Sequence, residues 1–101
     1  METTIRKDSS TQVTVIFDGR LDTLATQQAE IDVEPLYSYS DVDVIIDCSR
    51  LDYISSSGLR LFMSINQHCR ANQCSVYITG IKDKVRDVLQ ATGFVHLFQF
   101  K

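Results

Sequence analysis

Near the start of the chain, polar and apolar residues alternate. In residues 11–17, TQVTVIF, an apolar side chain occupies every second position from Val13 onward, and this period of two predicts a strand with one buried face. We expect the strand to end at the turn signal Asp18–Gly19. Residues 3–7 are expected to pair with it as an antiparallel hairpin.

The next segment, residues 23–39, has an approximately helical pattern that contains a proline. Leu24, Ile31 and Leu36 recur at roughly helical spacing, but Pro35 lacks a backbone donor and cannot continue an ordinary helix. We therefore predict an irregular first helix that is kinked or split at the proline.

Residues 42–48, VDVIIDC, are almost continuously apolar and rich in β-branched side chains. Such a run is typical of a strand that is covered on both faces, so we predict a central strand here.

Helix and strand patterns alternate through the rest of the chain. A helical pattern runs from the serines at 55–57 to about residue 70, residues 75–79 form a short β-branched strand, and helical spacing returns before Gly93. The apolar tail, residues 94–100, could add an edge strand. Strands that alternate with helices predict an α/β fold with a mixed sheet.

Composition and charge limit the possible functions. A chain of 101 residues is the size of one small domain, and its content of 44% hydrophobic and 23% charged residues predicts a folded, soluble protein. The formal net charge is −3 and the two signs are interspersed. Because nucleic acids and anionic membranes require a concentrated basic surface, a protein or a small ligand is the more plausible partner.

The chain has no apolar leader and no run long enough to cross a membrane, so we expect a cytoplasmic protein without membrane insertion. Its three cysteines, Cys48, Cys69 and Cys74, fit a reducing compartment and buried thiols. With His68 alone beside them they make a poor metal-ligand set, and we expect neither a metal nor a cofactor.

The three consecutive serines, Ser55, Ser56 and Ser57, precede the most strongly predicted helix. A serine hydroxyl at this position can cap the helix, which stabilises it by about 1 kcal/mol relative to alanine. A phosphoryl group on one of these serines would be stabilised by the unpaired N–H groups and the positive end of the helix. The first turn contains no acid to balance the charge of Arg60, and Arg60 could pair with a phosphate. An enzyme with a nucleophilic serine is not expected, since His68 lies some three turns along the helix and no nearer base is present.

Three segments resemble the STAS domain of bacterial anti-sigma factor antagonists: GRLD (Gly19–Asp22), VDVIIDCSRLDYISSSGLR (42–60) and VYITGIKDKVRDVLQATGFVHLF (76–98). The resemblance covers nearly the whole chain. It implies that residues 1–101 form a single STAS domain, with a mixed four- to five-stranded sheet, helices mainly on one face and no catalysis of its own.

The resemblance also implies a function. In the family, an anti-sigma factor with a serine-kinase fold phosphorylates a serine at the start of the second helix. The unphosphorylated antagonist binds that anti-sigma factor and releases a sigma factor, and a PP2C-type, metal-dependent phosphatase reverses the modification. Some STAS proteins are instead structural subunits of lipid-transporting ABC complexes, and this remains the alternative.

Matched to the family motif, the phosphorylation acceptor is Ser56. The preceding position, usually aspartate in the antagonists, is Ser55 here, and Ser55 or Ser57 could also be the acceptor. Asp22 is expected near the serine loop. The residues that follow the serines, Gly58, Leu59 and Arg60, are expected to shape the site or to contact the partner.

Overall fold

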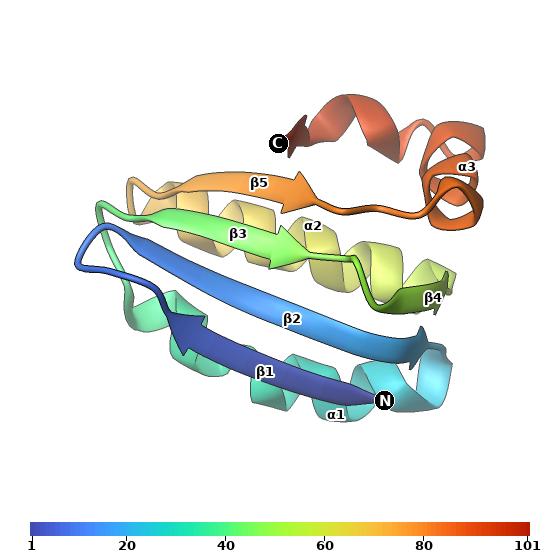
Figure 1. Ribbon diagram of the computed structural model, residues 1–101, viewed down its shortest axis with the longest axis horizontal. Helices are drawn as coiled ribbons and strands as arrows, with labels where there is room; N and C mark the ends of the chain where they lie inside the picture. The colour runs from blue at the N-terminus through green and yellow to red at the C-terminus, as the bar shows by residue number, and fades with distance from the viewer.

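In a computed structural model that describes residues 1–101, an N-terminal hairpin is followed by alternating helices and strands (Figure 1). The strands are β1 (Glu2–Lys7), β2 (Gln12–Leu21), β3 (Asp43–Asp47), β4 (Leu51–Ile54), β5 (Ser75–Thr79) and β6 (Gln99–Phe100). The helices are α1 (Thr23–Asp32), α2 (Ser56–Ala71) and α3 (Asp83–Ala91), with short 3-10 helices η1 (Glu34–Ser38) and η2 (Phe94–Leu97).

The sheet is mixed, as predicted. Its strand order is β1-β2-β3-β5-β6, and β4 pairs with the far end of β2 outside this path. Strand β1 is antiparallel to β2, whereas the other pairs are parallel. The predicted hairpin and the central position of β3 are therefore confirmed, and β4 brings the number of strands to six.

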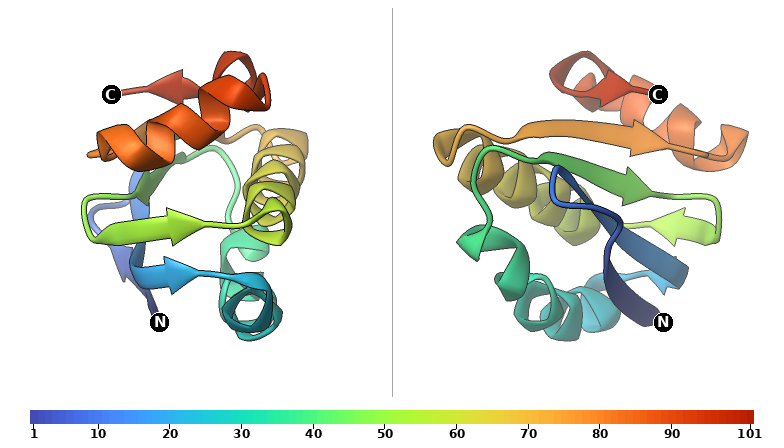
Figure 2. Two further views of the ribbon diagram at one scale, coloured as in Figure 1. Left: turned by 90° about the vertical axis from the view of Figure 1, so that its right-hand side faces the viewer. Right: turned by 60° about the vertical axis from the view of Figure 1, so that its left-hand side comes forward.

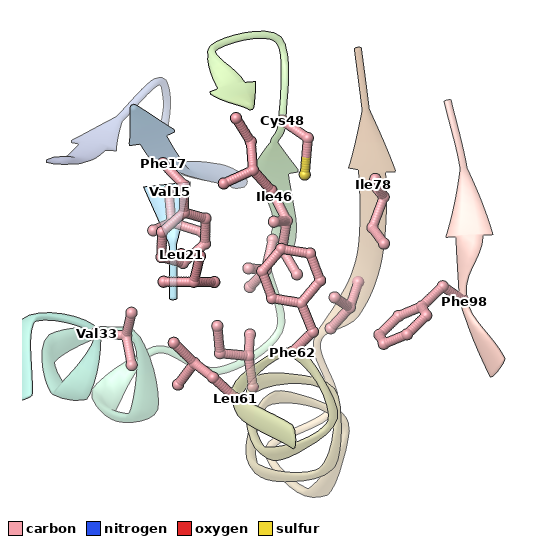
Figure 3. Packing of buried hydrophobic residues seen from close by; sticks show 14 of the residues in the cluster. Val15, Phe17, Leu21, Val33, Ile46, Cys48, Leu61, Phe62, Ile78 and Phe98 are labelled. Carbon is pink, nitrogen blue, oxygen red and sulfur yellow. The ribbon is translucent and has the colours of Figure 1, made fainter. Parts of the chain in front are cut away.

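Helices α1 and α2 cover one face of the sheet, while α3 lies beside β4 and η2 (Figure 2). Between the sheet and the helices lies a core of 23 buried residues. Phe62 of α2 is central to it, because its ring centroid lies 5.5 Å from that of Phe17 and 6.3 Å from that of Phe98 (Figure 3).

The prediction that the second strand ends at Asp18–Gly19 was wrong. Strand β2 continues to Leu21, and the Gly19 N–H donates a hydrogen bond to the carbonyl of Arg50. Gly19 has φ 114°, and the register between β2 and β4 shifts at this point. The glycine therefore lies within a longer strand, because β4 supplies backbone partners beyond it, and the extra residue at the register shift is Asp52 of β4.

The predicted split of the first helix at Pro35 is confirmed, since α1 ends at Asp32 and Pro35 lies in the first turn of η1. The apolar residues with helical spacing do not form one buried face, since only Leu36 among them is fully buried. Leu24 and Ile31 are 77% and 59% exposed, whereas the buried residues of α1 are Thr26 and Ala29. The buried face of this helix is therefore formed by two small residues, and its large apolar side chains are left outside.

The other predicted elements are present. Helix α2, strand β5 and helix α3 lie where the periodicity predicts them, and α3 is followed by Gly93 in the left-handed conformation, with φ 79°. The tail forms η2 before the two-residue strand β6 pairs with β5. None of the helices combines the length and the apolar character that crossing a membrane requires.

Candidate functional site at the start of helix α2

Two parallel strands end side by side and both lead into helices. Leu21, the last residue of β2, lies opposite Ile54, the last residue of β4. The next residue in each case is the N-cap of a helix: Asp22 for α1 and Ser55 for α2. The structure thus brings Asp22 and the serine cluster to the same end of the sheet.

The Asp22 carboxylate caps its own helix, accepting a hydrogen bond of 2.8 Å from the Ala25 N–H. It is half-buried. Asp22 therefore fixes the start of α1, and it directly follows Leu21, whose carbonyl accepts hydrogen bonds from Ser55.

Both the side chain and the backbone of Ser55 form hydrogen bonds within the chain. Its hydroxyl donates to the Leu21 carbonyl at 3.0 Å and accepts from the Gly58 N–H at 3.2 Å, and its backbone N–H donates to the same Leu21 carbonyl at 2.9 Å. Ser55 is the helix cap, one of the two roles that the sequence left open for the serines.

The next two serines differ in their surroundings. Ser57 is half-buried and its hydroxyl accepts a hydrogen bond of 3.2 Å from Arg60. Ser56 is exposed, and its hydroxyl has no hydrogen-bond partner within the chain. Of the three serine hydroxyls, only that of Ser56 is both exposed and free of hydrogen bonds.

Gly58 explains why this turn fits against the strand ends. A Cβ atom at Gly58 would lie 2.8 Å from Cγ1 of Ile54 and 3.0 Å from Cδ2 of Leu21. Leu59 is only 3% exposed and belongs to the core. Both residues can shape the site from beneath, and neither presents its side chain to a partner.

The start of α2 offers several groups that can bind an anion. The first turn of α2 contains no acid, and the N–H groups of Ser56 and Ser57 have no acceptor in the chain. Arg60 is exposed, with Ser57 as its hydrogen-bond partner. An anion placed at Ser56 would meet two free N–H donors, the positive end of the helix dipole and a guanidinium group nearby.

Strand β4, which leads into the site, was missing from the sequence prediction. It exposes Asp52 and Tyr53, and the Arg20 guanidinium lies 4.3 Å from the centre of the Tyr53 ring. Asp52 forms an ion pair of 2.6 Å with Lys82, and this hydrogen bond, with the charges of Lys82 and Lys84, lowers the pKa of the Asp52 carboxyl. Only the lone apolar residues at its two ends, Leu51 and Ile54, could have indicated this strand.

The STAS domain model matches residues 3–101, so the chain belongs to the STAS domain family. BtrV of Bordetella bronchiseptica, which carries the name of an anti-sigma factor antagonist, is 30% identical over 80 residues, covering 79% of this chain and 69% of that protein. The anti-sigma-B factor antagonist of Staphylococcus aureus is 27% identical over 79 residues, covering 78% and 73% respectively.

Solved structures support the same fold. The Bacillus cell fate determinant SpoIIAA in its phosphorylated form superposes with a TM-score of 0.73 at 19% identity, covering 99% of this chain and 91% of that one. The expected STAS fold with a mixed sheet is thereby confirmed, although the sheet has six strands where four or five were expected, because the short strand β4 adds to it.

Proposed function

We propose that this protein is an anti-sigma factor antagonist that acts in the cytoplasm and whose binding is switched by phosphorylation of Ser56. Family membership and the names of its relatives support the general role. Ser56 is proposed as the acceptor because its hydroxyl is exposed and free of hydrogen bonds, whereas the hydroxyls of the serines on either side are already hydrogen-bonded.

A modifying enzyme requires an accessible hydroxyl. Phosphorylating Ser55 would require its hydroxyl to leave the Leu21 carbonyl and the Gly58 N–H, which would uncap α2. Ser57 is half-buried and bonded to Arg60. Ser56 can accept a phosphoryl group without loss of any hydrogen bond within the chain.

The proposed partner is an anti-sigma factor that is also a serine kinase. It would transfer the γ-phosphoryl group of ATP to Oγ of Ser56, with release of ADP and of the hydroxyl proton. A PP2C-type phosphatase would later hydrolyse the ester. The STAS protein itself supplies the binding surface and the acceptor, and takes no catalytic part.

Charge explains how the modification would act as a switch. Phosphorylation adds about −1.5 to −2 charges, and the free N–H groups and Arg60 would hold the phosphate at the centre of the exposed turn. A partner that docks there must either desolvate a dianion or be repelled by it. We expect a loss of roughly a hundredfold in affinity, which corresponds to about 3 kcal/mol.

The experiment is affinity capture from the native organism with tagged wild type, Ser56→Ala and Ser56→Asp, followed by phosphosite mapping of residues 52–60. Wild type and Ser56→Ala should retain a kinase-type anti-sigma factor, whereas Ser56→Asp should lose it. Ser10→Asp is the matched control, because Ser10 is an exposed serine in the hairpin turn at the opposite end of β2.

The proposal fails if Ser56→Asp binds the anti-sigma factor as tightly as wild type, or if phosphate is found only on another serine. Recovery of a transporter ATPase, with all three serines unmodified, would assign the protein to the structural-subunit class instead. In that case the serine cluster would serve only as a helix cap.

A further inference from the structure

Strand β1 forms a free edge of the sheet, since it pairs with β2 on one side only. The backbone of β2 indicates which groups of β1 face outward. The Gly19 N–H donates to Arg50 and the Thr11 carbonyl accepts from Asp43, so the odd-numbered positions of β2 direct their backbone groups away from β1. Its even-numbered positions therefore bond to β1.

The register extends this alternation to β1. Arg6 lies opposite Thr14 and Ile5 opposite Val15, so the even-numbered residues of β1 are bonded to β2. The N–H and C=O groups of Thr3, Ile5 and Lys7 point outward, where no other strand lies. This edge contains neither proline nor a bulge, two of the features that block pairing at a free edge; it does carry the charged residues Arg6 and Lys7, which allow only a partner with matching charges.

Exposed apolar residues of α1 lie beside this edge. Leu24 and Ile31 are 77% and 59% exposed, and Met1 at the start of β1 is 47% exposed. Together they border a hollow of about 840 Å³ between α1 and the beginning of β1. Figures 1 and 2 show α1 at the same edge of the molecule as β1.

We propose that this edge is an interface with a second copy of the chain. The two β1 strands pair antiparallel about a two-fold axis perpendicular to the sheet, and the α1 helices flank the axis on the same face. The sheets of the two copies then become continuous, and Leu24 and Ile31 lose contact with water. This inference is independent of the proposed role of Ser56.

The charges of β1 select the register. With Thr3 opposite Ile5 of the second copy, Glu2 faces Arg6 of the second copy, and the two-fold symmetry makes this pair twice. The Nε of Arg6 donates a hydrogen bond to Asp8 of its own chain, so Glu2 of the second copy would be bound by the terminal nitrogens of the guanidinium group. A shift that places the two Ile5 residues opposite one another brings Glu2 next to Asp8. A further shift in the same sense, with Ile5 opposite Lys7, places the two Arg6 residues together. A shift in the opposite sense, with the two Thr3 residues facing each other, loses both Glu2–Arg6 pairs.

The same charges favour a second copy over an unrelated strand. Strand β1 carries its acid at one end and its bases at the other, so an antiparallel copy of itself is electrostatically complementary. The opposite edge of the sheet offers only the two residues of β6. The apolar stripe on α1 adds surface that the backbone pairing alone would not bury.

The test is sedimentation equilibrium over a wide range of protein concentration. Wild type should show a monomer–dimer equilibrium. In Glu2→Arg two arginines face each other at each pair, and in Arg6→Glu two glutamates do, so each variant should raise the dissociation constant about tenfold or more. An equimolar mixture of the two variants should recover dimers, because every pair is then again one arginine and one glutamate.

Asp87→Arg is the control, since it makes the same charge change as Glu2→Arg on the exposed face of α3, away from β1. Circular dichroism should show that each variant is folded. Ser56→Asp should leave the dimer unchanged, which separates this test from that of the proposed function.

A wild-type protein that stays monomeric up to its solubility limit would overturn the proposal. So would a dimer that neither charge reversal weakens, or a mixture of the two variants that associates no better than each alone. A complex formed only with a different protein at this edge would likewise assign the surface to that partner.

Discussion

Ser55 shows how one residue joins the candidate site to the fold. An aspartate at a helix N-cap can accept a hydrogen bond from the helix, but an ionised carboxylate cannot donate one. The Ser55 hydroxyl does both, accepting from Gly58 and donating to the Leu21 carbonyl 34 positions earlier in the chain. The serine therefore fixes the start of α2 to the end of β2.

We expect Ser55→Ala to lower the free energy of unfolding by about 1–2 kcal/mol, because the cap and the hydroxyl's hydrogen bond to Leu21 are both lost, while the backbone N–H still bonds to Leu21. Ser55→Asp retains an acceptor for the Gly58 N–H and should lose less. Urea denaturation measures both variants. Ser56→Ala is the control, with an expected change within about 0.5 kcal/mol, and an equal loss in Ser56→Ala would refute the assignment of Ser55 as the cap.

Gly58→Ala tests how tightly the first turn of α2 packs. In an open helical position this substitution would gain up to about 1 kcal/mol from backbone entropy. Here the new Cβ would lie 2.8 Å from Ile54 and 3.0 Å from Leu21, and overpacking of a core typically costs about 1–3 kcal/mol. We expect a net loss of stability on urea denaturation, whereas a gain would mean that the turn is loosely packed.

At the scale of elements, periodicity predicts those parts that bury one regular face. The hairpin, β3, α2, β5 and α3 belong to this group. The buried face of α1 is made of Thr26 and Ala29, which carry little hydrophobic signal, while the exposed Leu24 and Ile31 mimic a core pattern. The apolar spacing was misleading there because the residues that α1 buries are small and only weakly apolar.

For the candidate site, the sequence indicated which residues lie together but not how their side chains are bonded. The serines and Asp22 were found through their motif. The different environments of the three hydroxyls were not, because they depend on the Leu21 carbonyl and on the side chain of Arg60. Strand β4 is only four residues long and its two central side chains are exposed, so its alternation is too short to detect.

The β1–β2 hairpin contains a carboxylate that makes its stability depend on pH. Asp8 accepts hydrogen bonds from Thr14, Gln12 and Arg6, which lower the pKa of its carboxyl to about 2. Because the folded-state pKa lies below the unfolded value, this contribution is fully present above about pH 4 and is lost as the pH falls through about 2.

Asp8→Asn should therefore be less stable than wild type at neutral pH, and the difference should shrink between about pH 4 and pH 2. Urea denaturation at several pH values measures this difference. Asp87→Asn removes an exposed carboxylate without a hydrogen bond and should change stability little at any pH. A difference between Asp8→Asn and wild type that stays constant down to pH 2 would contradict the assignment.

Helices and strands from the whole chain contribute to one core, so the accessibility of its buried thiols should show when the molecule unfolds. Cys48 extends from the end of β3 into the core and Cys69 from the last turn of α2, and both are completely buried. Burial raises the pKa of the Cys48 thiol to about 12, with a further contribution from Asp47. Burial, together with Cys74, raises the pKa of the Cys69 thiol to about 11.

Since the thiolate is the reactive form, Cys48 and Cys69 should be labelled by an alkylating reagent at pH 8 only when the core opens. Mass-spectrometric mapping should find both unlabelled in the native protein and labelled in urea. Leu36 is also completely buried, so Leu36→Ala should cost about 2–5 kcal/mol and speed the labelling of both cysteines by at least about thirtyfold if opening is global. Fast labelling of native wild type, or a rate that Leu36→Ala leaves unchanged, would mean that the thiols are exposed by local motion and not by unfolding of the common core.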